Sequence, residues 1–357
     1  TRYISVTGVQ TCALPILEGL ECLVPALDAV VQYGAGLGVD EFVMGMAHRG
    51  RLNVLANIFN KTYSQIFGEF EGKVFQNETE EGFEDFEGDV KYHLGYSTDV
   101  DTASGKKVHL RLADNPSHLE AVNPVVKGLV RAKLDSKYQG DVTKICPILI
   151  HGDAAIAGQG IMYEVVQMSG LEAYYVGGTI HVVTNNQIGF TTNYLDARTS
   201  TYCTDVAKVT LCPVLHVNAD DVEAVVHAVK LAMAYRLEFN QDIFIDLLGY
   251  RKYGHNEGDE PRFTQPAMYK LIDKHPNPRE IYKQKLMERG DIDAALAQEM
   301  EADFRAQLQA KFEEAKGDFK PKTSDVKNTW EGFHHAKAKD FQNQVKTGVD
   351  VKTLQTL

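Results

Sequence analysis

Apolar segments of two kinds alternate between residues 145 and 248 of this 357-residue chain. Short uninterrupted runs rich in β-branched residues predict buried strands, and longer segments with apolar residues three or four positions apart predict the helices between them. Parallel neighbours need crossover connections, so this order predicts an α/β fold with a mostly parallel sheet and helices on both faces. The expected strands are 145–150, 179–184, 214–217 and 243–248, and the expected helices are 161–169 and 222–240.

Further elements are expected on either side of this region. Pro124 lies inside one predicted helix, where it must either bend the helix or mark its true start. Asp220 or Asp221 is expected to cap the long helix that begins at residue 222, because a carboxylate can accept the free backbone N–H groups there. The additional predicted elements are a strand at 41–46, helices at 51–60 and 118–135, and a charged helical extension beyond Asp291.

Two polar clusters directly follow consecutive predicted strands. Asp153 comes after the first strand and Asn186 after the second, and the carboxyl ends of parallel strands share one edge of a sheet. Carboxylate and amide oxygens suit Mg²⁺, which keeps other positions for water and phosphate oxygens. Asp153, the Asn186 side chain and the backbone carbonyl of Ile188 are therefore candidate metal ligands. Gly158 and Gly160, at the start of a helix, suit an anion, so the sequence predicts a magnesium-bound diphosphate.

The spacing of Asp153 and Asn186 resembles the Gly-Asp-Gly to Asn-Asn motif of thiamine diphosphate enzymes, with Ala154 in place of the usual last glycine. From about Leu17 onward, several further motifs are similar in order and spacing to the first, decarboxylating component of the 2-oxoglutarate dehydrogenase complex. These motifs are Met-Ala-His-Arg-Gly-Arg-Leu-Asn at 46–53, Tyr-His-Leu-Gly at 92–95, Asn-Pro-Ser-His-Leu-Glu at 115–120 and Gly-His-Asn-Glu-Gly-Asp-Glu-Pro at 254–261.

The resemblance implies a role for each candidate residue. Arg49 is expected to contact the cofactor diphosphate, with a structural salt bridge as the alternative, and Leu119 to pack against the cofactor, with core packing as the alternative. His93 and Ser117 are expected to bind the distal carboxylate of the substrate. His48 and His93 are also expected to assist catalysis, because a histidine titrates near neutral pH. The metal set of Asp153, Asn186 and Ile188 completes the cofactor site, and His118 and His255 are weaker candidates.

The same resemblance implies thiamine diphosphate and Mg²⁺ as cofactors and 2-oxoglutarate as substrate. A lipoyl-bearing second component would accept the succinyl group in the tricarboxylic acid cycle, and the full-length protein is expected to be a homodimer. Residues 17–290 are expected to form the diphosphate-binding domain of the thiamine diphosphate-binding fold. Residues 291–357 would form a helical extension and linker to a missing pyrimidine-binding domain, so we expect the fragment to be inactive alone. Residues 1–16 look like translated sequencing adapter.

Two alternatives remain at this stage. One is a relative that prefers 2-oxoadipate, because one methylene group changes binding by only about 1 to 3 kcal/mol. The other is a magnesium-nucleotide module without acyl chemistry, although the chain has no Gly-x-x-x-x-Gly-Lys-Ser/Thr signature and no Gly-x-Gly-x-x-Gly after a strand.

Composition narrows the class of protein further. The net charge of −12 argues against nucleic-acid binding, which relies on clustered lysine and arginine. The chain shows neither an apolar run long enough to span a membrane nor a signal peptide. Five cysteines without a Cys-x-x-Cys pair indicate reduced thiols, hence a bacterial cytoplasm, or a mitochondrial matrix if the source is eukaryotic. The acidic segment 69–89 is expected to be a solvated loop, with partner docking as the alternative.

Overall fold

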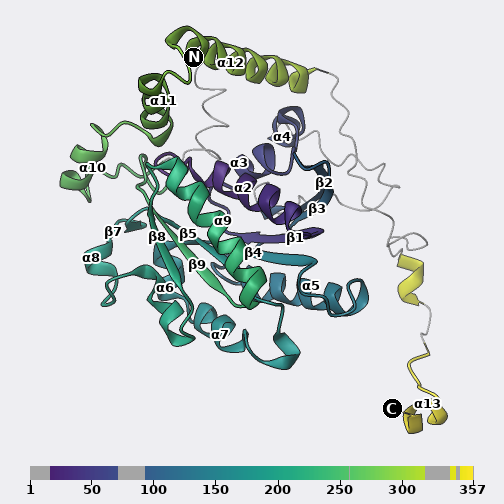
Figure 1. Ribbon diagram of the computed structural model, residues 1–357. Helices are drawn as coiled ribbons and strands as arrows, with labels where there is room; N and C mark the ends of the chain where they lie inside the picture. The colour runs from purple at the N-terminus through teal and green to yellow at the C-terminus, as the bar shows by residue number, and fades with distance from the viewer. Residues whose placement is uncertain (1–16, 71–92, 257, 318–337, 343–345, 357) are drawn as a thin grey trace. The chain divides into compact units, whose positions relative to one another are not determined.

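The computed structural model describes five stretches of the chain, which fall into two compact units (Figure 1). The first unit ends at Lys322 and contains the sheet. In the second unit, Thr323–Leu357, the short helices η4 (Ala338–Gln342) and α13 (Val351–Thr356) are described. The predicted adapter segment at 1–16 lies outside the described residues. The described stretches are 17–70, 93–256, 258–317, 338–342 and 346–356.

A seven-stranded sheet in the order β2-β3-β1-β4-β5-β9-β8 forms the centre of the first unit. Every neighbouring pair is parallel except β2 with β3. The predicted α/β fold with a mostly parallel sheet is therefore confirmed. The strands are β1 (Glu41–Met46), β2 (Tyr96–Asp101), β3 (Lys107–Leu112), β4 (Ile145–Gly152), β5 (Ile180–Asn185), β8 (Val214–Asn218) and β9 (Ile243–Leu248), and β6 (Ile188–Gly189) pairs with β7 (Thr192–Asn193) in a small second sheet.

Helices cover both faces of the large sheet (Figure 1). On one face lie α2 (Leu23–Gly36) and α9 (Val222–Phe239), and on the other lie α5 (Val122–Ser136) and α7 (Gly160–Met168). The remaining helices are α3 (Arg51–Asn57), α4 (Tyr63–Phe70), α6 (Asp153–Gly158), η2 (Glu172–Tyr174), α8 (Tyr194–Ala197), η3 (Cys203–Val209), α10 (Pro266–Ile272), α11 (Pro278–Arg289) and α12 (Ala294–Lys316).

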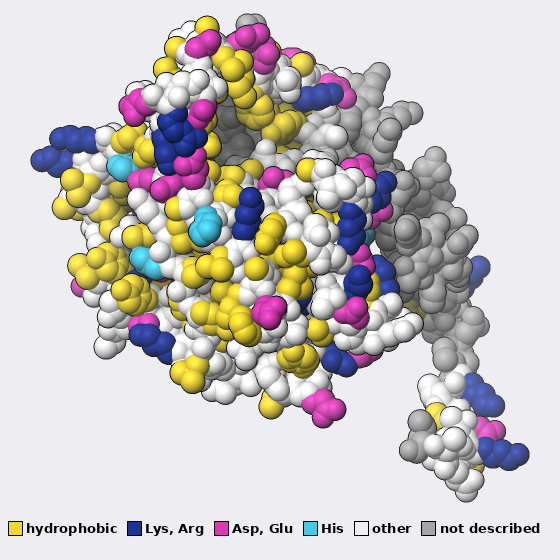
Figure 2. Space-filling view, viewed as in Figure 1, with side chains coloured by type: hydrophobic (Ala, Val, Ile, Leu, Met, Phe, Trp, Pro, Cys, Tyr) yellow, Lys and Arg dark blue, Asp and Glu magenta, His cyan; other side chains and the backbone are white. Residues whose placement is uncertain are grey.

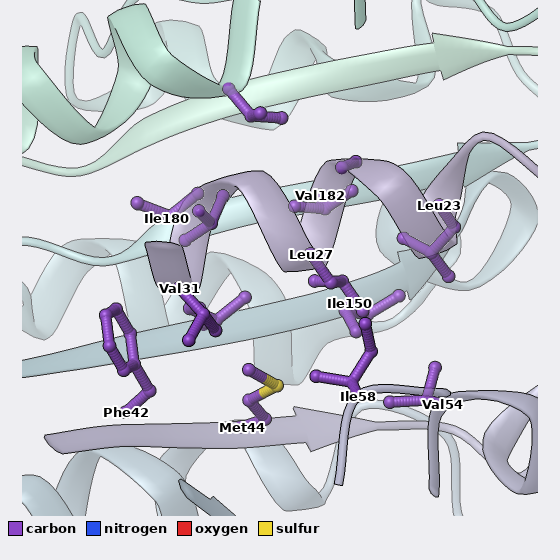
Figure 3. Close-up of a cluster of buried hydrophobic side chains, with 14 of the residues drawn as sticks. Leu23, Leu27, Val31, Phe42, Met44, Val54, Ile58, Ile150, Ile180 and Val182 are labelled. Carbon is purple, nitrogen blue, oxygen red and sulfur yellow. The ribbon is translucent and has the colours of Figure 1, made fainter. Parts of the chain in front are cut away.

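Alternating side chains of each central strand supply the two cores. Phe42 and Met44 of β1 pack in the α2 and α9 core, whereas Val43 packs in the core beneath α5. Leu23 and Leu27 of α2 lie over the strands in this first core, as Figure 3 shows. Full burial of one such side chain is worth roughly 1.5 to 3 kcal/mol, so the apolar strand runs hold the sheet between its helices.

The structure corrects the predicted start of α5. Residues 118–121 form a turn instead of helix, and Glu120 adopts a left-handed backbone with φ of 67°. Pro124 lies in the first turn of the helix, where a missing N–H costs nothing. Asp221, one of the two predicted caps of α9, accepts a hydrogen bond from the backbone of Ala224 at 3.2 Å.

Residues 69–89 were predicted to form a solvated loop. This prediction is wrong for residues 69 and 70, which are the last two residues of α4. Glu69 is buried because its carboxylate forms an ion pair with Lys61, a contact between residues eight positions apart. Most of the acidic segment, residues 71–89, lies outside the described residues.

The predicted helical extension is present as α12, which packs against α4. The ring centroids of Phe67 and Phe312 lie 5.4 Å apart, and those of Tyr63 and Phe304 lie 6.1 Å apart. This contact groups α12 with the compact unit that ends at Lys322. The assignment of residues 17–290 to a diphosphate-binding domain and of 291–357 to an extension and linker stays a prediction.

The surface of the described residues mixes chemical types. Figure 2 shows apolar side chains among charged ones on the face that α9 covers, and Leu231 and Phe239 of this helix are exposed. In the described part of the chain, no helix has both the length and the apolar character needed to cross a bilayer.

Candidate functional site

The predicted polar clusters meet at the carboxyl edge of the sheet. Met46 of β1 pairs with Ile150 of β4, and Gly152 pairs with Thr184 of β5. In turn, β5 pairs in parallel with β9, so four strands end side by side. The segments that follow them begin at residues 47, 153, 186 and 249, and they carry His48, Arg49, Asp153, Asn186, Ile188 and His255. The other candidates lie elsewhere: His93 precedes β2, and Ser117 and Leu119 follow β3.

Asp153, the first residue of α6, lies against the turn that carries Asn186. Asp153 is buried at the start of α6, a short helix that the sequence analysis missed, and the backbone N–H of Asn186 stabilises its carboxylate. A methyl group built on Gly189 would lie only 2.7 Å from Cβ of Ala154. The Asn186 side-chain oxygen accepts a hydrogen bond from the backbone N–H of Ile188 at 3.2 Å. All three predicted metal ligands are therefore buried in one small region.

The candidate donors Asp153, Asn186 and Ile188 suit Mg²⁺, which takes only some of its ligands from the protein. Burial raises the pKa of Asp153 to about 6, and the guanidinium of Arg198, 3.9 Å away, opposes this shift. Among the described residues, no group of three or more histidine, cysteine or acidic side chains could hold a metal. One carboxylate, one amide and one carbonyl leave octahedral positions for phosphate oxygens, which is the usual pattern for Mg²⁺.

Arg49 and Arg198 lie near Asp153, and Arg251 lies near Arg49. Arg49 donates to Nδ1 of His255 at 2.9 Å and to its carbonyl oxygen at 3.2 Å. Burial and the nearby Arg251 together lower the pKa of Arg49 to about 10, although Asp153 opposes this shift. Within the described stretches, buried Nη1 of Arg251 and buried Nε of Arg198 find no acceptor. Unused cationic donors of this kind fit an anion such as diphosphate.

Two candidate histidines from different segments lie close together. The ring centroids of His48 and His93 lie 5.9 Å apart, and His93 is buried. Burial, Arg49 and His93 together lower the pKa of His48, which favours the neutral form of its imidazole. Burial and Arg49 likewise lower the pKa of His255 to about 4. Neutral imidazoles can both donate and accept hydrogen bonds, which suits recognition of a polar substrate.

Ser117 and Leu119 lie in the segment between β3 and α5. Ser117 is exposed, as is the weaker candidate His118, whereas Leu119 is half-buried. The base of this segment reaches the histidine pair, because the backbone N–H of Asn115 bonds to the carbonyl of His93 at 3.1 Å. The structure thus connects the segment to His93 through Asn115.

Sequence analysis missed the side chain that braces these loops. Arg51 is fully buried and donates to the carbonyl oxygens of Met46, Leu94 and Ala113, each from a different segment. The available signal was an arginine beside Leu52 in an otherwise apolar helical stripe.

The first asparagine of the Asn-Asn pair also has a role that sequence analysis did not assign. Asn185 donates to Asp246 of β9 at 3.0 Å, and its oxygen accepts from the backbone of Gln187 at 3.2 Å. Gln187 has a left-handed φ of 65°. Asn185 therefore fixes the turn that presents Asn186 and Ile188.

The fold and the site define an α/β protein of the class whose ligands bind at the carboxyl edge of a parallel sheet. In this chain that edge carries the buried carboxylate of Asp153 and several arginines. Within this class, the chain belongs to the dehydrogenase E1 component family, whose sequence model matches residues 25–324. Relatives named "2-oxoglutarate dehydrogenase E1 component" from Brucella canis, Brucella suis and Brucella abortus are each 46% identical over 351 residues, which is 96% of this chain. The chain spans 34% of the length of these relatives.

Proposed function

We propose that the full-length protein containing this chain is the decarboxylating component of a 2-oxoglutarate dehydrogenase complex. Its 2-oxo acid is 2-oxoglutarate, and its acyl acceptor is a lipoyl group on the second component. The observation that carries the proposal is the proximity of Asp153, at the start of α6, to the turn of Asn186 and to Arg49. The names of the Brucella relatives support the substrate, and their bacterial origin supports a cytoplasmic location.

In this proposal the chain holds Mg²⁺ and the diphosphate of thiamine diphosphate. Asp153, the side chain of Asn186 and the carbonyl of Ile188 bind the metal, while Arg49 neutralises diphosphate oxygens. Leu119 packs against the cofactor. When bound, thiamine diphosphate supplies the chemistry that makes decarboxylation of a 2-oxo acid possible.

The remaining candidates act on the substrate. His93 and Ser117 donate hydrogen bonds to the distal carboxylate of 2-oxoglutarate, and His48 holds or moves a proton at its imidazole during acyl transfer. The low pKa of His48 favours this role, because a neutral ring can accept a proton at neutral pH. We further propose that the full-length protein works as a homodimer.

Calorimetry on the 357-residue chain tests cofactor binding. We expect thiamine diphosphate to bind only with Mg²⁺, and ATP with Mg²⁺ to bind much more weakly. Asp153→Ala should abolish the magnesium-dependent binding, whereas Asp135→Ala, which removes an exposed carboxylate on α5, should leave it unchanged. Equal binding of both ligands, or binding by D153A at the original affinity, would contradict the proposal.

The substrate is tested on the full-length protein by competition between 2-oxo acids. We expect a higher kcat/KM for 2-oxoglutarate than for 2-oxoadipate, with release of carbon dioxide that depends on thiamine diphosphate. A preference for the longer acid would assign the protein to the alternative substrate within the same chemistry.

A further inference from the structure

A buried chain of polar side chains lies beside the candidate site and is not used by the proposed function. His151 is at its centre, two residues before Asp153 on β4. Nδ1 of His151 lies 2.6 Å from a carboxylate oxygen of Glu120, and Nε2 lies 3.0 Å from Nδ1 of His181. His181 in turn lies 3.4 Å from Asp242, and all four side chains are buried. Because both ring nitrogens of His151 have partners, the orientation of the ring is fixed.

Glu120 occupies a strained position that this contact stabilises. A left-handed backbone is unfavourable for glutamate and favourable for glycine, yet Glu120 adopts φ of 67° while buried. The oxygen that contacts His151 also accepts from the Asn123 side chain at 2.5 Å. Strain of this kind persists where surrounding contacts over-determine the conformation, and it is concentrated at functional sites.

His151 also holds the metal-side loop through its backbone. Its carbonyl oxygen accepts a hydrogen bond from the hydroxyl of Thr184 at 2.8 Å, two residues before Asn186. A single residue therefore connects the turn at Glu120, the strand that ends before Asp153 and the strand that ends before Asn186.

The segment from 113 to 120 is consequently attached at both ends. At its base, Arg51 donates to the carbonyl of Ala113, and Asn115 bonds to the carbonyl of His93. At its other end, Glu120 is attached to His151. Ser117 and Leu119 lie between these attachments.

We infer that Glu120 and His151 are positioning residues that fix the 116–119 segment relative to the metal-binding loops. The inference rests on the proposed function, because that function gives Ser117 and Leu119 their substrate and cofactor. His181, stacked on Phe244 at 4.2 Å between ring centroids, supports the His151 ring from behind. Release of the attachment at Glu120 would leave Asp153 in place at the start of α6 and let the substrate-facing segment move.

The test uses Glu120→Gly, because glycine removes the carboxylate and also relieves the backbone strain at this φ. In the full-length protein we expect kcat/KM for 2-oxoglutarate to fall on the order of 10- to 100-fold, mainly through a higher KM. In the ligand-free protein, amide hydrogen exchange across 113–121 should become faster. Glu120→Gln should restore both properties, since an amide oxygen can accept from His151 and Asn123.

Glu41→Ala is the matched control for simple loss of stability. Glu41 is a fully buried carboxylate at the amino end of β1, bonded to Lys137 at 3.0 Å and to Tyr138 at 2.9 Å. This variant should unfold more easily and keep the original KM and the original exchange at 113–121. If Glu120→Gly does not fold, Glu120→Asp makes the same test. Its side chain is one methylene group shorter, so its carboxylate should not reach His151.

The outcomes separate the two proposals. A parent protein that neither binds thiamine diphosphate nor decarboxylates 2-oxoglutarate refutes the proposed function, and the exchange measurement still tests the attachment. An active parent whose E120G variant keeps the original KM and exchange overturns the positioning role. Equal impairment of E120Q and E120G would also overturn it, because the hydrogen bond to His151 would then not be the cause.

Discussion

Replacement of Arg51 by methionine should destabilise the chain strongly. Removal of the buried charge is favourable by itself, but the loss of the hydrogen bonds outweighs this gain. The guanidinium donates to carbonyl oxygens of Met46, Leu94 and Ala113, and the side chain is fully buried. Methionine has a similar volume and no donor, so these carbonyl groups lose their partner without gaining access to water.

The magnitude follows from two opposing effects. A buried carbonyl group that loses its donor costs about 1 to 3 kcal/mol, so the loss of the three attachments costs roughly 6 kcal/mol. Burial lowers the pKa of Arg51 from 12.5 to about 10, and removal of the charge therefore recovers on the order of 3 kcal/mol. The net expectation for Arg51→Met is a loss of about 3 kcal/mol in the free energy of unfolding.

Urea denaturation followed by circular dichroism measures this loss. Arg51→Lys retains the burial penalty but not the planar fork of donors, so it should be no more stable than Arg51→Met. Arg305→Met, which removes an exposed arginine on α12, is the control and should leave the denaturation midpoint nearly unchanged. A loss for R51M no larger than that for R305M, or full stability of R51K, would refute the reasoning.

Two further predictions concern pH and backbone geometry. Burial alone would raise the pKa of Asp242, but His181 and Lys127 hold this pKa at about 2. The ionised carboxylate therefore stabilises the fold above about pH 4, and this stability is lost as the pH falls towards 2. Asp242→Asn should therefore cost on the order of 2 kcal/mol in urea denaturation at pH 7 and clearly less at pH 3; an equal cost at both would contradict this. Gly178→Ala should cost more than about 2 kcal/mol, since its Cβ would collide with a backbone carbonyl, whereas Gly105→Ala, also left-handed but in open space, should cost about 1 kcal/mol by the same assay; equal costs would contradict the collision.

The sequence predicted the central strands well because their burial on both faces leaves uninterrupted apolar runs. The observed bounds of β1 and β9 are those expected from 41–46 and 243–248. Strand β3 was missed because Lys107, His109 and Arg111 alternate with apolar residues, and a search for continuous runs overlooks that pattern. A search for alternating apolar and polar residues would have found this strand.

The candidate site also has a part that the sequence predicts and a part that it does not. Motif order and strand ends were enough to place Asp153 beside Asn186, since adjacent parallel strands bring their carboxyl ends together. The contact of Arg49 with His255 joins residues 206 positions apart, and no local pattern encodes such a distance. The polar chain through Glu120 and His151 was likewise invisible, because each of its members is unremarkable among its neighbours in sequence.

The buried arginines explain how a sheet of apolar strands holds polar loops in fixed positions. Arg51 and Arg251 donate to backbone carbonyls at the carboxyl edge. At the opposite edge, Arg236 donates to the carbonyls of 142, 176 and 178 in loops and of 145 at the start of β4. In each case a buried guanidinium satisfies backbone carbonyls of neighbouring segments, so the protein itself supplies contacts that hold these segments in position. In the proposed function, segments held in this way lose little conformational entropy when the diphosphate binds, so the buried arginines contribute to binding by fixing the segments that contact it.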